Sequence, residues 1–558
     1  MKKKYAITAL SISLVLALTG CSGKDNGLRE SGTDRSESNA STQESVEETK
    51  ESEETLPKQE EDSGQAGASE CLSLYVGNYS DSCWTEDYET ELINMTYPII
   101  ALSGEDKDTY PELAEALQEL SGNIKKEMRN AYENDMDVAA DDYKMCVEEG
   151  YPFYGPYTSE AEFHVVRADD KAVGIVEEGY SYCGGAHGIY YSGGWNFDTK
   201  TGKKLDIKDV VTDTGKLADI VEEKVFAEYD LSADRLFLPE GDTLSDYVTD
   251  MIADEELSLC WVITNVGIEI YFNPYEIASY ADGLITARVG FQEYPEIFSD
   301  YYTKAPKAFV MPYLSYSMAK RDFDNDGSAD YVSVWAEQDE YDTYTTLHVV
   351  VNGVELTCDL WAYGFTPYFV HTGEGKTYLY VLCSSDNDYE FIKVFSLNGK
   401  GPSYVDEIGN CGFRWQLINE EEYEYAEEAF LNPDSFYMTS HLEVLSTYGG
   451  YRRYHVGADG MPVTEDEWYV IPDYGDRVLT AKQDVVCKLV DEDGSVISGE
   501  AKIPSGTKLT FYRTDGKEWV DLTDGDKIYR VFEVRDEWPY KINGVDEEEL
   551  FDGIMYAG

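Results

Sequence analysis

The sequence predicts a multidomain protein in which an α+β domain is followed by an all-β repeat region and a small β-barrel. Three observations lead to this fold class. Between residues 71 and 300, apolar residues recur at both helical and strand spacing, which indicates mixed secondary structure. Short strand-like runs separated by Gly, Asn and Asp dominate the rest of the chain. A length of 558 residues also exceeds what a single hydrophobic core usually supports.

The first 21 residues resemble a bacterial lipoprotein signal. Lys2-Lys3-Lys4 precedes an apolar run from Ala6 to Leu18, which is too short to span a bilayer. The run ends in Leu18-Thr19-Gly20-Cys21, which is similar to a lipobox, where the Cys thiol is lipidated and becomes the new N-terminus. We therefore expect residues 1–20 to be a signal peptide and lipidated Cys21 to hold the protein on the outer face of the cell membrane. The alternative is an ordinary secretory signal with a chance Cys.

Residues 21–70 are rich in Ser, Glu, Thr, Asp and Gly and contain almost nothing apolar. Such a segment cannot bury enough surface to offset chain entropy, so we expect a disordered acidic tether. The whole chain carries a formal charge of −66, and residues 21–70 account for only a small part of it. The folded remainder is therefore also acidic. This charge argues against nucleic acid as a partner and permits divalent cations or cationic proteins. Surface solubility is the simpler explanation of the same charge.

The first folded unit is expected over residues 71–300. Residues 91–100 alternate in polarity like a strand, and Pro111 stands near the start of a helix. One face of this helix is apolar at Leu113, Leu117, Leu120, Ile124 and Met128. A second helix is predicted at 215–229, and further strands at 163–167, 173–182, 190–198, 262–272 and 284–290. Helices mixed with antiparallel strands make this unit an α+β domain.

A family resemblance is carried by three motifs of this unit, which are Tyr182-Cys183-Gly184-Gly185-Ala186-His187-Gly188, Asn196-Phe197-Asp198 with Thr201-Gly202-Lys203, and Tyr271-Phe272-Asn273-Pro274-Tyr275-Glu276-Ile277-Ala278 with Tyr280-Ala281-Asp282-Gly283. The region from about residue 85 to residue 300 resembles the extracellular domain of the RsiV-like anti-sigma factors. That domain also occurs fused to a peptidoglycan deacetylase. In the anti-sigma factors it binds lysozyme, so the resemblance implies a binding domain outside the cell.

The chain departs from both family designs. It lacks a cytoplasmic sigma-binding segment, and its sequence contains neither Thr-Phe-Asp-Asp nor a His-x-x-x-His pair of the kind that the deacetylases use. Binding is then the only family behaviour that could carry over, and we predict that the protein is not an enzyme. The ligand-binding candidates are His187, Asn273 and Tyr275. The alternatives are a hydrogen-bonded structural His and a turn shaped by Asn-Pro-Tyr.

The middle unit, residues 306–473, reads as all-β, and its landmark is an Asp-x-Asp-x-Asp-Gly run. This spacing turns alternate oxygens toward one Ca²⁺ ion, which prefers six to eight such ligands. We predict a structural Ca²⁺ site made by Asp322, Asp324, Asp326, Ser328 and Asp330. The run resembles the calcium loops of integrin-type propellers, and loose strand–turn–strand repeats suggest propeller-like blades. An Asx-rich turn without an ion and an open β-sheet assembly are the alternatives.

The third unit, residues 478–558, contains short strands at 485–490, 508–513 and 527–534. Turn signals at Asp493-Gly494 and Asp515-Gly516 separate them. This unit resembles a small SH3-like barrel of the bacterial surface type. Many such barrels bind wall peptides, and others are only structural.

Together these features predict a noncatalytic binding protein of the cell envelope, with lysozyme or wall peptidoglycan as the ligand. Lysozymes are often basic, and the acidic charge would speed encounters with them. One rival class is a cell-wall hydrolase or modifying enzyme, for which the sequence offers no recognisable catalytic motif. The other is a solute-binding lipoprotein, which a deep apolar pocket in the first unit would favour.

Overall fold

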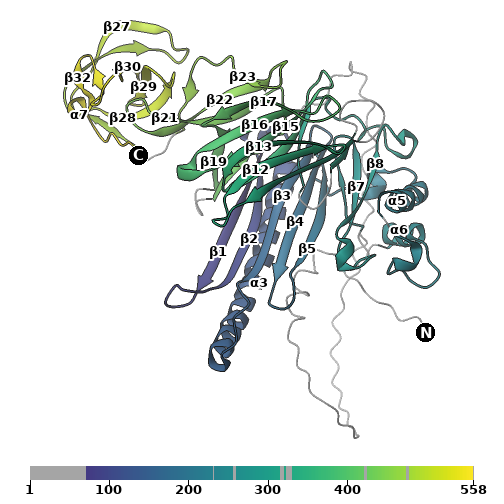
Figure 1. Cartoon of the computed structure of the whole chain (residues 1–558). Coiled ribbons are helices and arrows are strands. Elements are labelled where there is room, and N and C mark those ends of the chain that lie inside the picture. The colour runs from purple at the N-terminus through teal and green to yellow at the C-terminus, as the bar shows by residue number, and fades with distance from the viewer. Residues whose placement is uncertain are drawn as a thin grey trace, which may run out of the picture.

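The computed structural model describes residues 71–229, 231–254, 259–314, 319–321, 330–419, 424–472 and 477–556. The predicted signal peptide, Cys21 and the tether lie outside these ranges. Within them, a mixed α and β region comes first and antiparallel β-sheets follow, which confirms the predicted order (Figure 1). Over the same ranges, none of the helices combines the length and the apolar character that crossing a membrane requires.

A seven-stranded sheet forms the centre of the N-terminal region (Figure 1). Its order is β19 (Trp415–Asn419), β20 (Glu424–Glu428), β1 (Leu74–Trp84), β2 (Glu91–Leu102), β3 (Tyr157–Ala168), β4 (Ala172–Tyr182) and β5 (Ile189–Asp198). Neighbours are antiparallel except β2 and β3, which run parallel because a long helix connects them. Because β20 pairs with β1, two strands from residues 306–473 extend this sheet.

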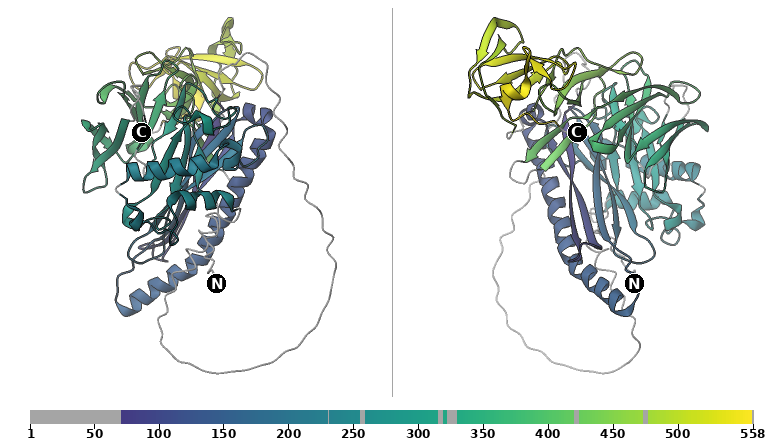
Figure 2. Two further views of the ribbon diagram at one scale, coloured as in Figure 1. Left: turned by 90° about the vertical axis from the view of Figure 1, so that its right-hand side faces the viewer. Right: turned by 60° about the vertical axis from the view of Figure 1, so that its left-hand side comes forward.

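Helix α3 (Pro111–Glu149) packs on one face of this sheet, after the short helix α2 (Gly104–Thr109). Pro111 is its first residue, and the five predicted apolar positions are buried, which confirms the predicted start and face. The helix is 39 residues long, and Gly150 ends it in the left-handed conformation (φ 75°). Beyond the predicted stripe, Ala139 is buried and packs near Leu92 and Ile93 of β2. The C-terminal end of the helix runs beyond the ends of the strands (Figure 2).

A three-stranded sheet packs on the opposite face and consists of β6 (Trp261–Ile263), β7 (Gly267–Phe272) and β8 (Ile285–Gly290). The prediction of one strand over residues 262–272 is wrong, because β6 and β7 are the two arms of a hairpin. The hydroxyl of Thr264 accepts hydrogen bonds from the N–H groups of Val266 and Gly267 at 3.2 and 3.1 Å. These local bonds offer the backbone an alternative to a continuous strand.

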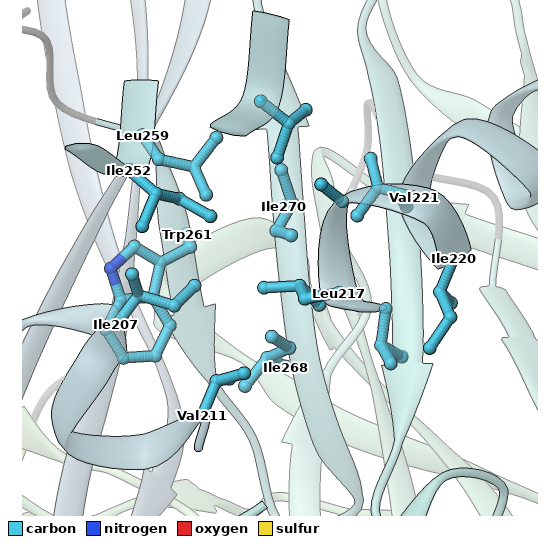
Figure 3. Close-up of a cluster of buried hydrophobic side chains, with 14 of the residues drawn as sticks. Ile207, Val211, Leu217, Ile220, Val221, Ile252, Leu259, Trp261, Ile268 and Ile270 are labelled. Carbon is cyan, nitrogen blue, oxygen red and sulfur yellow. The ribbon is translucent and has the colours of Figure 1, made fainter. Parts of the chain in front are cut away.

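The outer face of this second sheet is covered by the helices α4 (Ile207–Val210), α5 (Thr214–Glu228) and α6 (Leu244–Ala253). Asp213 caps the start of α5 and Thr243 caps α6, each by accepting a backbone N–H bond. Leu217 of α5 and Ile270 of β7 meet in the apolar cluster of Figure 3. The N-terminal region is therefore layered as α3, the large sheet, the small sheet and the helices α4 to α6.

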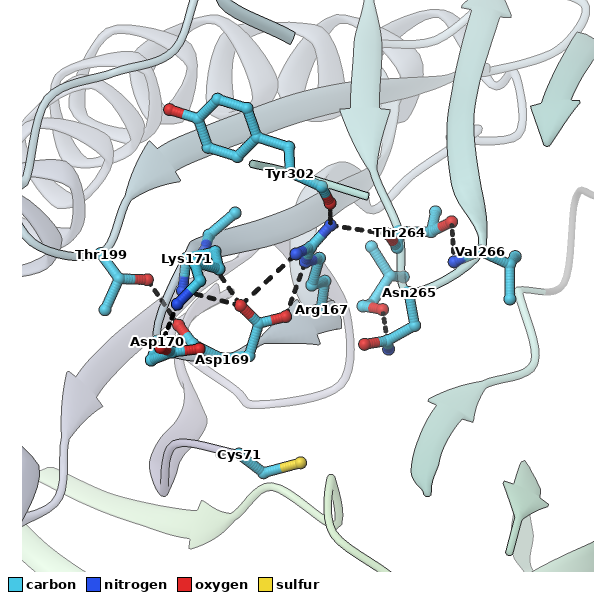
Figure 4. Close-up of polar contacts among 12 residues, drawn as sticks. Cys71, Arg167, Asp169, Asp170, Lys171, Thr199, Thr264, Asn265, Val266 and Tyr302 are labelled. Carbon is cyan, nitrogen blue, oxygen red and sulfur yellow. Dashed lines mark hydrogen bonds and ion pairs between the residues drawn. The ribbon is translucent and has the colours of Figure 1, made fainter. Parts of the chain in front are cut away.

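A buried charge network joins the layers at Arg167 of β3 (Figure 4). Arg167 and Asp169 are both 0% exposed, and their Nε and Oδ2 atoms lie 2.8 Å apart. The guanidinium also donates to the carbonyls of Tyr302, at 2.7 Å, and Thr264, at 3.4 Å. One side chain thus connects the large sheet, the β6–β7 turn and the segment that follows β8.

The middle region consists of two antiparallel sheets that pack face to face through a shared core. The first contains β10 (Ala319–Arg321), β11 (Asp330–Gln338), β12 (Tyr344–Val351) and β13 (Val354–Ala362). The second has the order β17 (Ser403–Gly409), β16 (Glu390–Ser396), β15 (Thr377–Ser384), β14 (Gly364–His371) and β9 (Phe309–Pro312). In the part of the chain that the structure describes, the sheets do not close into a ring.

The C-terminal region is a 14-stranded sheet. Its strands are β18 (Gly412–Phe413), β21 (Phe436–Leu442), β22 (Tyr448–Val456), β23 (Pro462–Val463), β24 (Tyr469–Val470), β25 (Leu479–Ala481), β26 (Val485–Val490), β27 (Val496–Ile503), β28 (Lys508–Thr514), β29 (Trp519–Thr523), β30 (Ile528–Val534), β31 (Lys541–Ile542), β32 (Val545–Asp546) and β33 (Phe551–Asp552). The three strands predicted here are confirmed as β26, β28 and β30. The core also contains Leu442 and Tyr448, so it begins before residue 478.

The remaining helices of the described residues are α7 (Glu547–Leu550) and the 3₁₀ helices η1 (Ala233–Arg235), η2 (Tyr280–Asp282), η3 (Pro295–Ile297) and η4 (Asp386–Asp388).

Arg414 connects the N-terminal sheet to the C-terminal strands. Its Nε lies 2.9 Å from a carboxylate oxygen of Glu428 on β20, and its guanidinium donates to the hydroxyl of Tyr75 on β1. The same group lies 4.4 and 4.9 Å from the ring centroids of Tyr437 on β21 and Tyr451 on β22. Because an Arg held by a carboxylate and aromatic faces is well fixed, this contact sets how the two regions meet.

Candidate functional site

The structure brings two of the three ligand-binding candidates together. His187, in the loop between β4 and β5, stacks on Tyr280 with ring centroids 4.1 Å apart. Tyr275, in the turn after β7, lies 5.7 Å from the Tyr280 ring, and Tyr190 of β5 lies 5.5 Å from it. We call these four residues, His187, Tyr190, Tyr275 and Tyr280, the Tyr280 cluster.

Contacts with the backbone hold the His187 loop against this cluster. The Tyr280 hydroxyl donates a hydrogen bond to the Gly188 carbonyl at 3.0 Å, and His187 Nδ1 lies 2.9 Å from the same oxygen. A Cβ atom at Gly188 would lie 2.4 Å from the Tyr180 ring, so a larger residue there would require that ring to move. The loop is therefore held between two tyrosines, which fixes the plane of the His187 ring.

Asn273, the third candidate, lies next to the Tyr280 cluster but is only 8% exposed. Its side-chain oxygen accepts a hydrogen bond from the Ser192 N–H at 2.7 Å, and its side-chain nitrogen donates to the Ser192 carbonyl at 3.1 Å. These two bonds fasten the turn after β7 to strand β5. The geometry gives Asn273 the role of positioning that turn, and with it Tyr275.

Glu276 closes the same turn. Its carboxylate accepts a hydrogen bond from the Asn273 N–H at 2.9 Å. Burial raises the pKa of the Glu276 carboxyl from 4.5 to about 7, and the backbone hydrogen bond offsets part of that rise. Between these residues, Tyr275 has φ 70° and leaves 52% of its surface exposed. A bulky residue in the left-handed region is strained, and here the strained turn presents its ring to solvent.

The pKa of Glu276 predicts a pH dependence for this turn. In the folded protein the Glu276 carboxyl keeps its proton to a higher pH than in the unfolded chain. The contribution of this protonated carboxyl to the stability of the fold is therefore fully present below about pH 4.5. It is lost as the pH rises toward about 7. Glu276→Gln should flatten this profile and stabilise the turn at pH 7.5 by about 2 kcal/mol relative to the wild type. Hydrogen exchange of residues 272–280 at pH 5 and 7.5 measures the stability of the turn, and Glu240→Gln, at an exposed position, is the control. If the stability of the wild type and of Glu276→Gln changed equally with pH, the predicted role of Glu276 would be refuted.

The Tyr280 cluster supplies flat aromatic faces rather than a nucleophile with its base. Aromatic rings stack on sugar rings and cover the apolar or cationic side chains of a partner protein. Tyr is also among the residue types that dominate the energetics of protein interfaces. The arrangement is therefore suited to binding.

The predicted calcium residues can be placed only in part. Four of them lie outside the described residues: Asp322, Asp324, Asp326 and Ser328. Asp330, the first residue of β11, is buried and accepts a hydrogen bond from the side chain of Asn352 in the β12–β13 turn. Among the residues that the structure does describe, no group of three or more His, Cys, Asp or Glu is arranged to hold a metal ion. The calcium site stays a prediction.

A groove of about 660 Å³ lies between α3 and strands β4 and β5. Its walls include Leu120, Ile124 and Met128 of α3, and its floor includes Glu177 of β4 and Trp195 of β5. This volume falls within the range of small-molecule sites in proteins. Tyr190 and Trp195 point to opposite faces of β5, but the groove also reaches Leu259 and Cys260 at the edge of this strand, and Cys260 belongs to the apolar cluster on which Tyr190 packs.

Glu177 is the polar centre of the groove floor. One carboxylate oxygen accepts a hydrogen bond from Trp195 Nε1 at 2.7 Å, and the other accepts one from the Tyr191 hydroxyl at 3.0 Å. Burial raises the pKa of Glu177, the two hydrogen bonds oppose that rise, and the nearby charge of Glu127 adds to it. Lys204 lies with its Nζ 4.3 Å from the centre of the Trp195 ring. The groove therefore combines an oriented carboxylate with an indole that already faces an ammonium group.

Sequence reasoning missed both Tyr280 and the groove. Tyr280 belongs to a motif that carries the family resemblance, but its contact with His187 joins η2, which lies between β7 and β8, to the loop between β4 and β5. For the groove, a signal was present, because β4 is apolar from Ala172 to Val176 and then places Glu177 in the middle of the strand. An acidic residue in a largely buried strand indicates a polar partner, which here is Trp195.

Two family models match the N-terminal region. One, described as deacetylase PdaC, matches residues 86–190, and the other, a protein of unknown function named DUF3298, matches residues 215–292. The predicted resemblance is thus confirmed at the level of these two domains. The Tyr280 cluster combines His187 and Tyr190 from the first match with Tyr275 and Tyr280 from the second.

Two crystal structures of DUF3298 family members are similar to 42% of this chain. The one from Bacteroides fragilis shares 16% identity, is covered over 96% of its length and has a TM-score of 0.32. The one from Pseudomonas aeruginosa shares 15% identity, is covered over 98% of its length and has a TM-score of 0.27. The comparison with curated proteins found no match.

Proposed function

We propose that the protein is a noncatalytic binding protein, anchored by lipidated Cys21 on the outer face of the cell membrane, whose N-terminal region recognises a basic protein such as a lysozyme. The Tyr280 cluster is the observation that supports this best. It gathers residues from both family-matched segments into one aromatic group, and Tyr275 exposes 52% of its surface. The formal charge of −66 attracts a basic partner, and the rings provide the contact.

In this proposal, the rest of the chain is a scaffold that carries the binding region. Residues 21–70 are the tether, the middle sheets are propeller-like blades with a structural Ca²⁺ loop, and the C-terminal strands form an SH3-like domain. An enzymatic role ranks behind binding, although one matched family is described as a deacetylase, because the Tyr280 cluster offers rings instead of a catalytic pair.

Calorimetry with a basic lysozyme tests the proposal on the lipid-free chain from Ser22 to Gly558. Binding should persist from low salt to about 0.5 M salt, where long-range attraction is screened. Tyr275→Ala and Tyr280→Ala should each weaken binding by about tenfold or more, because aromatic anchors dominate such interfaces. Tyr341→Ala is the matched control, since Tyr341 is 75% exposed in the middle region.

Two results would count against lysozyme as the specific ligand. One is binding that disappears in salt and is equal for all variants, which reduces the interaction to charge. The other is no binding at low salt. Peptidoglycan fragments are then titrated with the same variants, and a loss caused by Tyr275→Ala alone among the exposed tyrosines would make wall glycan the ligand.

The groove favours a second function, that of a solute-binding lipoprotein. Its volume of about 660 Å³ and its apolar walls are the features expected of a small-ligand site. None of the four residues of the Tyr280 cluster lines the groove, so the two functions do not exclude one another.

A further inference from the structure

The groove between α3 and β5 has apolar walls and is lined by more acidic than basic side chains. Glu119 and Glu127 stand on α3 at its rim, Glu177 lies on its floor, and Lys204 is the basic residue among those that line it. Three carboxylates therefore face one ammonium group. Such a site attracts a cation and repels an anion.

We propose that the groove binds a small ligand with an apolar body and a primary amine, and that Glu177 receives the ammonium group. The inference rests on the second proposed function, the solute-binding role of the groove. It adds the chemical class of the ligand and the residue that selects it.

The geometry of Glu177 supports this assignment. The bonds from Trp195 Nε1 and the Tyr191 hydroxyl, at 2.7 and 3.0 Å, engage one site on each carboxylate oxygen. Each oxygen of a carboxylate offers two lone-pair directions, so both keep acceptor capacity. Because its orientation is already fixed, the carboxylate loses little freedom when an ammonium group binds.

Room for the ligand comes from Gly193, the residue of β5 opposite Glu177 in the β4–β5 ladder. A Cβ atom at Gly193 would meet Glu177 Cβ at 3.4 Å, which is ordinary van der Waals contact. The backbone therefore tolerates a side chain at this position. The absence of one leaves the space above Glu177 open, next to the apolar side chains of Ile124 and Met128 on α3.

Three probes of equal length test the proposal on the lipid-free full chain: octylamine, octan-1-ol and octanoate. We expect octylamine to bind about tenfold more tightly than octan-1-ol, because the hydrogen bond to Glu177 is charge-assisted. Octanoate should bind more weakly than either. Calorimetry below the micelle concentration measures all three.

Variants locate the binding. Gly193→Leu fills the groove and should abolish octylamine binding, whereas Gly122→Leu, on the exposed side of α3 with nothing within 4 Å of its Cβ position, should not change it. Glu177→Gln keeps the shape of the side chain and should remove most of the preference for octylamine over octan-1-ol.

The outcomes separate the two levels of the inference. Equal binding of the three probes, lost in Gly193→Leu, would leave the groove as a solute site and overturn the amine specificity. If none of the three probes bound, or if Gly193→Leu left their binding unchanged, the groove would not be a ligand site. The solute-binding function would then be overturned as well. Neither result bears on the Tyr280 cluster, which lysozyme titration tests separately.

Discussion

Replacing Arg167 by Met should destabilise the N-terminal region by about 3–5 kcal/mol, because it leaves a buried charge without its partner. Arg167 and Asp169 are both 0% exposed, so water cannot replace the lost ion pair. The carbonyls of Thr264 and Tyr302 would lose their donor as well. Faster hydrogen exchange in β3, β6 and β7 and a lower thermal midpoint are the expected readouts.

Two controls separate loss of the charge pair from loss of packing. Lys216→Ala removes an exposed ion pair with Glu296 and should cost no more than about 1 kcal/mol. Adding Asp169→Asn to Arg167→Met should recover part of the stability, since the uncompensated charge is then gone. If Arg167→Met behaved like Lys216→Ala, the network in Figure 4 would not hold the layers together.

Replacing Gly194 by Ala should be as damaging, although it adds only one carbon atom. A Cβ atom at Gly194 would lie 1.9 Å from the carbonyl oxygen of Trp261, so β5 and β6 would have to move apart. That carbonyl accepts a hydrogen bond from the Asn196 side chain at 2.9 Å, which would be strained or lost. We expect a loss of about 3 kcal/mol or more, because backbone atoms cannot rotate out of the way.

Gly193→Ala is the matched control, since it is the preceding residue of the same strand and faces the open groove. Its Cβ atom would meet nothing closer than 3.4 Å, so the variant should retain wild-type stability within about 0.5 kcal/mol. Thermal unfolding of both variants, together with hydrogen exchange in β6, measures the difference. Similar stability of the two variants would show that β6 does not pack on β5 in this way.

Local periodicity predicted the elements well where one face of an element is buried. The spacing from Leu113 to Met128 predicted the covered face of α3, because residues three and four apart share one side of a helix. It was not followed into the second half of the helix, where Tyr132, Met136, Ala139 and Tyr143 continue the helical spacing and pack against the strand residues Leu92, Ile93 and Tyr157. The strand predicted over residues 262–272 fails for a different reason, because the apolar runs on both sides of Thr264 resemble one continuous strand.

The family resemblance predicted three residues of the candidate site, and the structure added Tyr280. The motifs pointed to His187, Asn273 and Tyr275, and the structure places all three within one small region. Their roles differ, because Asn273 bonds to Ser192 while Tyr275 is exposed. Tyr280, on which His187 stacks, could not be singled out, since nothing local to its motif records a ring contact with a distant loop.

The sequence by itself determined the acidic charge, the order of an α/β region before β-sheets, the buried face of α3 and the motifs that the two family models match. These are properties of composition and of short-range spacing. Only the tertiary structure decided that β20 pairs with β1, that Arg167 joins β3 to the β6–β7 turn and to the segment after β8, and that a groove opens above Glu177. The physical reason is that a local pattern records which side of an element is buried, whereas its partner depends on contacts between residues far apart in the chain.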